Sequence, residues 1–229
     1  MSELKTTARL AGLSYLGLAI TGMLGFLLLR PMIFDPADAA NTAANLVDKE
    51  VLARLTIALE LGVVLTQALA AIWFFKLFRL VNPVTAGSIA AFGLVNAIII
   101  LVSSAAMVTA LKVALTPSLA PGGDVAATVQ LMFAISAAAW QVGMLFFGLW
   151  LIPMGYVTLT SNWMPKGLGY VLMVGGVGYM LSCFATVLLP ANFGWVAELL
   201  PLPATVGEFW MIFYLLIIGV RPKAEAASA

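Results

Sequence analysis

A glutamate stands in the middle of a strongly apolar segment, IALELGVVLTQ at residues 57–67. Glu60 shares one helical face with Thr56 and Gln67, because the three residues are spaced at i, i+4 and i+11. A carboxyl group in apolar surroundings can take up a proton, bind a cation or hold a neighbouring helix through a hydrogen bond. The spacing therefore predicts a polar stripe on this helix rather than a lone acid.

A second glutamate, Glu208 in TVGEFWMIF, lies about four residues (about 6 Å) from the centre of its own apolar segment, as Glu60 does. If both segments cross a membrane in the same direction, the two carboxyl groups lie at nearly one depth. We therefore predict one polar pocket, on the outer side, around Glu60 and Glu208. Other candidate binding residues are Gln67, Lys112 and Gln141, with Asn96 and Ser103 near them and with Lys112 or Arg30 as the charged partner of Glu60.

The same polar residues also fit a purely structural interpretation. They could form hydrogen bonds between helices, or a carboxyl group could stay protonated because it is desolvated. Arg54 is a poor partner for Glu60, since a six-residue step separates them by about 9 Å along a helix and turns them to different faces. Both interpretations, a ligand pocket and an interhelical network, remain open at the level of sequence.

Composition decides the class of protein. Hydrophobic residues make up 63% of the 229 residues, charged residues only 9%, and the mean hydropathy is +1.08, values typical of a membrane protein with several spans. The net charge is +1 and basic residues are not clustered in the sequence, so nucleic acid is not an expected partner. The expected partner is the lipid bilayer.

The residue inventory also excludes most cofactors. The chain contains no histidine, so bis-histidine haem, histidine-bound copper and the usual zinc sites lack their ligands. The single cysteine cannot form an internal disulfide. We expect no cofactor, no metal site and no catalytic residue.

Six apolar stretches are long enough to cross a membrane, which takes about 20 helical residues. We therefore predict an all-α bundle in which residues 1–229 form a single transmembrane domain without an inserted soluble domain. The predicted helices lie near residues 10–30, 53–76, 86–113, 128–151, 167–189 and 203–221.

Basic residues predict the orientation, because cytoplasmic loops of membrane proteins are enriched in lysine and arginine. Placing the N-terminus inside gives seven basic residues on the cytoplasmic side and four on the outer side. Both termini are therefore predicted to be cytoplasmic. The seven are Lys5, Arg9, Lys76, Arg79, Lys166, Arg221 and Lys223, and the four are Arg30, Lys49, Arg54 and Lys112.

The connections between helices are short. Residues 31–51 are predicted to form an outer loop with solvated acids, followed by a short amphipathic lead into the second long helix; the spacing of the acids matches no EF-type calcium loop. Pro153 and Pro165 are predicted to end the helices on either side of residues 153–167. An aromatic belt is expected near the inner boundary, formed by Trp73, Trp150, Trp163, Tyr156 and Tyr170.

Glycine is concentrated in the fifth predicted helix, GLGYVLMVGGVGYMLSCF. Gly169, Gly176 and Gly178 do not follow a strand, so a phosphate-binding loop lacks its structural context. Small residues in membrane helices instead allow close helix packing. We predict that these glycines lie at a helix contact.

Several segments, taken in order along the chain, resemble the bacterial domain of unknown function 4386 family. They are ARLAGLSYL, LFRLVNP, FFGLW, MGYVTLTSNWMPKGLGYVLMVGGVGYML and GEFWMIFYLLIIGV. The resemblance implies a six-helix integral membrane protein of the bacterial inner membrane and adds no activity or catalytic residue. It matches Glu208 and Arg9 to family positions, whereas Trp150 stands where the family pattern leads us to expect a histidine.

Three hypotheses of function follow. The first is a protein that binds or transports a small molecule, a proton or a lipid through the pocket around the two glutamates; the absence of an internal repeat weighs against a secondary transporter. The second is an intramembrane enzyme, which the lack of histidine and of aspartates within helices disfavours. The third is a non-catalytic accessory or structural subunit of a membrane complex, or a self-associating protein, docked through the glycine-rich helix.

Overall fold

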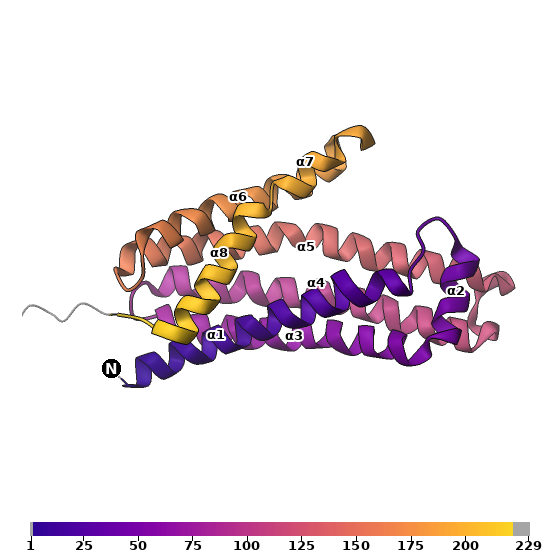
Figure 1. Cartoon of the computed structure of the whole chain (residues 1–229), viewed down its shortest axis with the longest axis horizontal. Helices are drawn as coiled ribbons and strands as arrows, with labels where there is room; N and C mark the ends of the chain where they lie inside the picture. Colours follow the sequence, from indigo (N-terminus) through magenta and orange to yellow (C-terminus); the bar gives the residue numbers. More distant parts are fainter. Residues whose placement is uncertain (1, 222–229) are drawn as a thin grey trace, which may run out of the picture. The chain divides into compact units, whose positions relative to one another are not determined.

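The computed structural model of the protein describes residues 2–221, and helices are the regular structure throughout this part of the chain (Figure 1). The three longest α-helices of the described residues have 29, 33 and 37 residues, and shorter helices follow them at the C-terminal end. The α-helices are α1 (Ser2–Gly22), α2 (Ala39–Asp48), α3 (Glu50–Phe78), α4 (Pro83–Leu115), α5 (Val125–Ser161), α6 (Lys166–Leu188), α7 (Gly194–Leu199) and α8 (Leu202–Phe213).

Within residues 2–221, six helical segments have the length and hydropathy needed to cross a membrane. This confirms the predicted all-α class and the six predicted helices of a multi-pass membrane protein. The six segments are Glu3–Met32, Glu50–Phe78, Pro83–Leu115, Val125–Ser161, Lys166–Leu188 and Gly194–Ile218.

Two helices end differently from the prediction. Pro153 was expected to end a helix but lies inside α5, which continues to Ser161, so that prediction was wrong. Proline removes one backbone hydrogen bond, and membrane helices tolerate this loss because neighbouring groups compensate for it. The last membrane segment begins at Gly194 rather than near residue 203, and it is broken between α7 and α8.

Polar residues at helix starts explain several boundaries. Asp38 accepts a hydrogen bond from the backbone N–H of Asn41 at 2.9 Å and begins α2. Asn82 and Asp124 do the same for α4 and α5, at 3.0 and 2.9 Å. Each side chain satisfies one of the backbone donors that a helix leaves unpaired at its N-terminus.

The chain divides into two compact units. Unit 2 consists of Gly17–Thr66 and Ala97–Gly143, and it contains α2 with parts of α1, α3, α4 and α5. After α1, the backbone continues as a π-helix, Met23–Leu29, and one 3₁₀ turn, Arg30–Met32. The hydrophobic core of unit 2 packs around Leu46, Met107 and Phe133, which are 2% exposed or less.

The predicted outer loop is ordered within unit 2. The amphipathic lead is α2, and Gln130 of α5 donates hydrogen bonds to the backbone carbonyls of Asp35 and Pro36. Lys49 donates to the carbonyl of Met32 at 2.9 Å. These bonds fix the chain that connects α1 to α3, next to the residues described below.

Unit 1 consists of the chain up to Leu16, Gln67–Asn96 and the chain from Met144 onward, and it contains α6, α7 and α8. Glycines let α5 and α6 approach closely: a Cβ on Gly155 would lie 2.6 Å from the carbonyl oxygen of Gly169, and one on Gly176 would lie 2.8 Å from that of Gly148. This confirms the predicted packing role of Gly169 and Gly176.

The remaining glycine face of α6 packs on the C-terminal helices. A Cβ on Gly175 would overlap Ala204 of α8, and a Cβ on Gly178 would overlap the backbone of Leu200. Both faces of α6 that carry glycine are therefore covered by other helices of unit 1.

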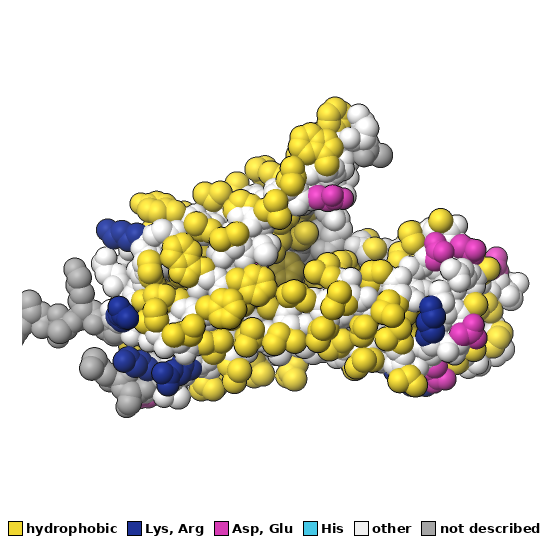
Figure 2. Space-filling view, in the orientation of Figure 1, with side chains coloured by type: hydrophobic (Ala, Val, Ile, Leu, Met, Phe, Trp, Pro, Cys, Tyr) yellow, Lys and Arg dark blue, Asp and Glu magenta, His cyan; other side chains and the backbone are white. Residues whose placement is uncertain are grey.

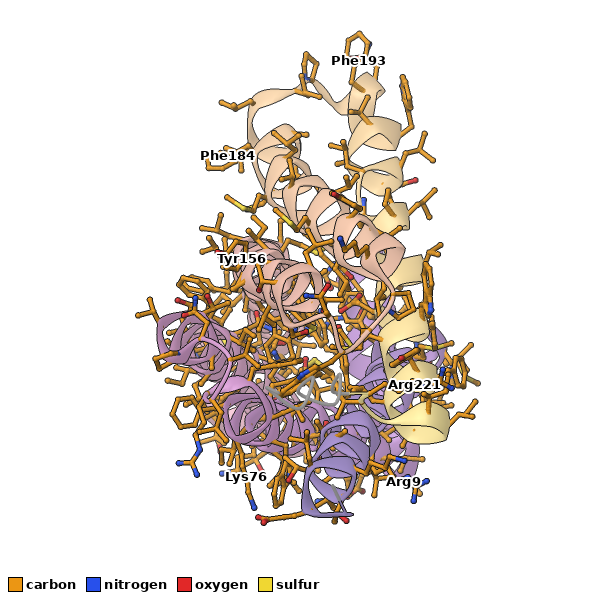
Figure 3. The ribbon with its side chains drawn as sticks, turned by 90° about the vertical axis from the view of Figure 1, so that its left-hand side faces the viewer. Arg9, Lys76, Tyr156, Phe184, Phe193 and Arg221 are labelled. Atoms are coloured by element: carbon orange, nitrogen blue, oxygen red, sulfur yellow. The ribbon has the colours of Figure 1, made fainter. Side chains whose placement is uncertain are left out.

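Apolar side chains cover the lengths of the helices on the face shown in Figure 2, and charged side chains gather near helix ends. Large exposed aromatics of unit 1 include Tyr156, Phe184 and Phe193, which lie at its periphery in Figure 3. Trp150, expected in the aromatic belt, is instead 1% exposed, so this part of the prediction was wrong. Such an apolar surface is what a membrane-embedded protein presents to lipid.

Candidate functional site

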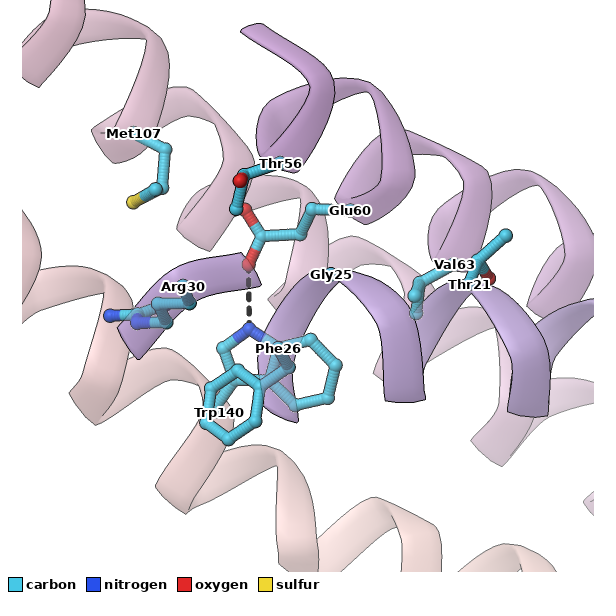
Figure 4. Close-up of a pocket in the computed structure, with 9 residues that line it drawn as sticks. All are labelled: Thr21, Gly25, Phe26, Arg30, Thr56, Glu60, Val63, Met107 and Trp140. Atoms are coloured by element: carbon cyan, nitrogen blue, oxygen red, sulfur yellow. Dashed lines mark hydrogen bonds between the residues drawn. The ribbon is translucent and has the colours of Figure 1, made fainter. Parts of the chain in front are cut away.

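Glu60 of α3 is the centre of a buried polar cluster in unit 2. Its side chain is 6% exposed, and its Oε1 accepts two hydrogen bonds of 2.6 Å. One comes from the Ser103 hydroxyl of α4, and the other, the dashed line in Figure 4, comes from the Trp140 indole N–H of α5. Short hydrogen bonds to a carboxylate oxygen are the strong, charge-assisted kind. The expected meeting of Glu60 with Ser103 is confirmed.

A chain of hydroxyl groups connects Glu60 to a buried arginine. Ser103 and Ser136 lie 2.6 Å apart, and Arg30 Nη1 donates to Ser136 Oγ at 2.7 Å. With Glu60 ionised, Ser103 gives its only proton to the carboxylate, so Ser136 must donate to Ser103 and accept from Arg30. The chain therefore has one direction, from the guanidinium to the carboxylate.

Arg30 is only 7% exposed and is held by both hydrogen bonds and aromatic rings. Its Nη2 donates to the carbonyl of Phe133 at 3.2 Å, and its guanidinium lies 5.2 to 5.8 Å from the ring centres of Phe26, Phe34 and Phe133. Aromatic faces stabilise a cation that has left water. The 3₁₀ turn at Arg30–Met32 ends the first membrane segment and turns this side chain into unit 2.

Arg30 is the charged partner that balances Glu60. The two side chains line the same cavity and interact electrostatically, although two serines separate their polar atoms. Lys112, the other predicted partner, is exposed and forms no ion pair within residues 2–221. Arg54 pairs with Glu50 at 2.6 Å, as an i, i+4 pair on the exposed start of α3.

A small cavity adjoins Glu60. The volume of the cavity is about 10 Å³, which is close to the minimum that holds one ordered water molecule. Glu60 Oε2 is buried and has no hydrogen-bond partner within residues 2–221, in contrast to Oε1. The residues that line the cavity are Thr21, Gly25, Phe26, Arg30, Thr56, Glu60, Val63, Met107 and Trp140 (Figure 4).

Gln67, the third residue of the predicted stripe on α3, belongs to unit 1. It is 1% exposed, and neither amide atom has a hydrogen-bond partner among the residues that the structure describes. Asn96 of α4 is likewise buried with both amide atoms unpaired. Buried amides without partners carry a desolvation cost that no bond in the structure offsets.

Glu208 has a different set of partners, all within unit 1. Tyr15 of α1 donates to its Oε1 at 2.6 Å, and Tyr179 of α6 donates to its Oε2 at 3.0 Å. Both carboxyl oxygens are thus hydrogen-bonded, and the side chain connects α1, α6 and α8. Glu208 does not line the cavity at Glu60, nor do Gln67, Lys112 and Gln141.

Trp150 packs beside Tyr15. Its ring lies 5.8 Å from the rings of both Tyr15 and Phe74, and Gly93 of α4 provides the space, since a Cβ there would overlap the indole. The position where a histidine was expected therefore holds part of the aromatic packing next to the Glu208 site.

Sequence reasoning missed four residues of the two glutamate sites: Trp140, Tyr15 and Tyr179, which bond to a glutamate, and Ser136, which bonds to Ser103 and Arg30. On α5 it selected Gln141, which is half-buried, whereas its neighbour Trp140 reaches Glu60. One residue turns a helix by about 100°, so an error of one position selects a different face. A usable signal was the spacing of Phe26, Arg30 and Phe34, which puts aromatic rings one turn to each side of a cation.

The carboxylates are dispersed rather than clustered. Within residues 2–221, no three His, Cys, Asp or Glu side chains converge on a point that a metal ion could occupy. The Glu60 cluster therefore offers one carboxylate, two hydroxyls, an indole N–H and a guanidinium, which is a set suited to moving or holding a proton.

A family model described as a domain of unknown function, DUF4386, matches residues 10–219. The chain belongs to this family. The matched range includes every residue of the two glutamate sites, and the six membrane segments agree with the resemblance seen in the sequence. No curated protein sequence and no solved structure matches the chain.

Proposed function

We propose that this DUF4386 membrane protein takes up a proton at Glu60 and transports it. One observation carries the proposal: Oε1 of Glu60 already accepts two short hydrogen bonds, whereas the buried Oε2 has no partner in the described part of the chain and the residue lines a cavity of about 10 Å³. A proton added to Oε2 leaves both bonds to Oε1 in place. Ionisable groups held in this way inside membrane helices are typical of proton pathways.

The size of the cavity favours a proton over a larger ligand. It has room for about one water molecule, which can carry a proton to the carboxyl group but leaves no space for an organic substrate or a lipid headgroup. The sequence left three ligands open, a small molecule, a proton and a lipid, and of these we propose the proton. The pocket around both glutamates becomes a site at Glu60 alone.

Arg30 supports the proposal electrostatically. An isolated carboxylate in apolar surroundings is costly, and the permanent charge of Arg30, connected through Ser136 and Ser103, offsets this cost. Because the serines separate the two charges, Glu60 can gain or lose a proton without breaking a direct ion pair. Glu208, with both oxygens bound by tyrosines, has a structural role in this proposal.

The test compares proton binding with proton flux. Infrared difference spectra between alkaline and acid pH should contain a carboxylic acid band that Glu60→Gln removes. In liposomes with an internal pH-sensitive dye and an imposed potassium diffusion potential, the wild-type protein should acidify the interior, and Glu60→Gln should abolish that flux.

Glu50→Gln is the matched control, because Glu50 lies on the same helix in the same unit but is exposed and paired with Arg54. It should keep both the band and the flux. A flux that is equal in wild type, Glu60→Gln and protein-free vesicles would disprove transport, and an unchanged infrared band would disprove proton binding at Glu60.

The accessory-subunit hypothesis loses its main support. It rested on the glycine-rich helix as a docking surface, but those glycines pack against α5, α7 and α8 of the same unit. No other observation favours a particular protein partner over lipid for the exposed apolar surface.

A further inference from the structure

Unit 1 carries a group of basic side chains near the ends of its helices. We name this group the cationic end: Lys5, Arg9, Lys76, Arg79, Lys166 and Arg221. All six are exposed, and several are visible as blue patches near the start of α1 in Figure 2. Arg9, Lys76 and Arg221 lie on the side of unit 1 that faces the viewer in Figure 3. They come from segments far apart in the sequence.

Carboxylates do not neutralise the cationic end. The described part of unit 1 contains three acids, and only Glu3 pairs with a member of the group, Lys76, at 3.4 Å. Glu208 is bound by two tyrosines, and Glu198 lies on α7 without an ion pair in the described chain. Five cations thus remain without an acidic partner within residues 2–221.

Two of these cations, Arg221 and Lys166, lie close to the aromatic residue Trp163, one through a backbone hydrogen bond and one along the chain. The backbone N–H of Arg221 donates to the Trp163 carbonyl at 3.2 Å, and the Tyr214 hydroxyl donates to the same oxygen at 3.3 Å. Lys166 follows three residues after Trp163 and begins α6. Lys5 packs against Gly219, where a Cβ would lie 3.6 Å from Lys5 Cγ.

The position of this group relative to the membrane segments matters as much as its charge. The cations lie at the ends of three membrane segments, where apolar helix surface gives way to polar residues. These ends are the start of Glu3–Met32, the end of Glu50–Phe78 and the start of Lys166–Leu188. Lys76 also lies 5.7 Å from the ring of Trp73. Basic and aromatic side chains at this level of a membrane meet the phosphate groups of lipids.

We propose that the cationic end binds the phosphate of anionic phospholipids, with Lys5, Lys166 and Arg221 as the centre of the site. Phosphate oxygens accept charge-assisted hydrogen bonds from ammonium and guanidinium groups, and an anionic headgroup supplies the charge that unit 1 lacks. The acyl chains would lie along the exposed apolar helices next to it. This inference is independent of proton uptake at Glu60.

The experiment is native mass spectrometry of the full-length protein in detergent, titrated with phosphatidylglycerol or with phosphatidylcholine. Phosphatidylglycerol should bind more tightly to the wild-type protein. The Lys166→Gln, Arg221→Gln double variant should bind it about 30-fold more weakly, which corresponds to about 1 kcal/mol for each basic residue. Binding of phosphatidylcholine should not change.

Arg54→Gln with Lys112→Gln is the control, because it removes two exposed cations from unit 2. It should leave phosphatidylglycerol binding unchanged. The single variant Lys166→Arg keeps both positive charges and should bind phosphatidylglycerol as the wild-type protein does. All of these variants should unfold at the wild-type temperature.

Three results would overturn the proposal: equal affinity for the two lipids, equal losses in the test and control variants, or displacement of the lipid by millimolar inorganic phosphate alone. The last result would identify a site for free phosphate instead of a lipid site.

Discussion

Glu60 and Glu208 are both glutamates within apolar helices, yet their carboxyl groups are bound to different degrees. Glu208 accepts one tyrosine hydroxyl on each oxygen, whereas Glu60 accepts two donors on Oε1 and none on Oε2. A carboxyl group with both oxygens bound is a connection between helices. One with a free oxygen beside a water-sized cavity can change its protonation state without rearranging its neighbours.

Ser136 tests the hydroxyl chain. Ser136→Ala leaves a buried Arg30 N–H without its acceptor and the Ser103 oxygen without its donor, which should destabilise the protein by about 1–3 kcal/mol. Thermal unfolding in detergent measures this. Ser104→Ala is the control, since Ser104 is equally buried but bonds only to the carbonyl of Ile100 in its own helix, and it should cost less than about 1 kcal/mol. Equal losses of stability in the two variants would contradict the hydrogen-bonded chain between Arg30 and Glu60.

The tyrosines test the role assigned to Glu208. Tyr15→Phe removes the 2.6 Å donor and keeps the ring that packs on Phe74 and Trp150, so it should lower stability by about 1–3 kcal/mol. Proton flux through liposomes, corrected for folded protein, should stay at the wild-type level. If Tyr15→Phe abolished flux in a folded protein, Glu208 would belong to the transport pathway.

At this scale the sequence predicted which residue types would be buried but not all of their contacts. Glu60 and Ser103 stood out because polar residues are rare in these helices, and they do meet. Trp140 and Tyr15 did not stand out, because an indole or a phenol in a membrane helix resembles ordinary aromatic packing. Which donor reaches a carboxylate depends on helix rotation, and the uniformly apolar surfaces of these helices give little rotational signal.

The α5–α6 contact depends on glycine at the element scale. Gly155→Ala would place a Cβ 2.6 Å from the Gly169 carbonyl oxygen, so the helices must separate, and we expect a loss of about 1–3 kcal/mol. Gly87→Ala in α4 is the control, because no atom of the described residues outside its own helix turn lies within 4 Å of its Cβ position, and it should stabilise the protein by about 0.5–1 kcal/mol. Unfolding temperatures that move in the same direction would contradict this packing.

The loop before α2 makes a pH-dependent contribution to the stability of the folded protein. The side-chain hydrogen bond from Asn41, and then the backbone N–H of Ala37, lower the pKa of Asp35. A lowered folded-state pKa stabilises the folded loop above the unfolded value of about 3.9, and this contribution is lost as the pH falls through the folded-state pKa. Asn41→Ala should raise the pKa of Asp35.

Carbon-13 NMR titration of labelled aspartate side chains measures this change. Asn45→Ala, which leaves the bond between Asp35 and Asn41 intact, should not shift the titration of Asp35. An Asp35 midpoint that is the same in all three proteins would show that Asn41 does not set it.

Helix ends were the least predictable feature of the elements. The sequence predicts a helix end at Pro153, but α5 passes through it because a membrane helix has no competing water to end it. The start of α7 was missed for the converse reason: Pro201 and Pro203 divide the last segment into short pieces, and no long apolar run marks its beginning.

For the whole molecule, hydropathy alone was sufficient to predict six membrane segments, because each must bury about 20 apolar residues in lipid. The division into two units was not predictable in this way. It depends on which helix faces pack together, and the units share α1, α3, α4 and α5, so that no boundary appears along the sequence.

One of the basic residues that predict the orientation is buried. Arg30 counted among four basic residues on the predicted outer side, but it is 7% exposed and bound to Ser136. It therefore does not act as a loop charge, and the comparison becomes seven against three. Of the seven, Lys223 lies outside the described residues. The stronger asymmetry favours cytoplasmic termini.

Cysteine accessibility tests this orientation in intact cells. In a Cys183→Ala background, Asn41→Cys of α2 should react with a membrane-impermeant maleimide, because that loop is expected outside. Leu80→Cys, in the connection after α3 where Leu80 is 84% exposed, should react only after the membrane is opened. The reverse pattern would place the termini outside and the cationic end in the outer leaflet. Glu60 would then lie nearer the cytoplasmic side, and a proton that it takes up would enter from the cytoplasm.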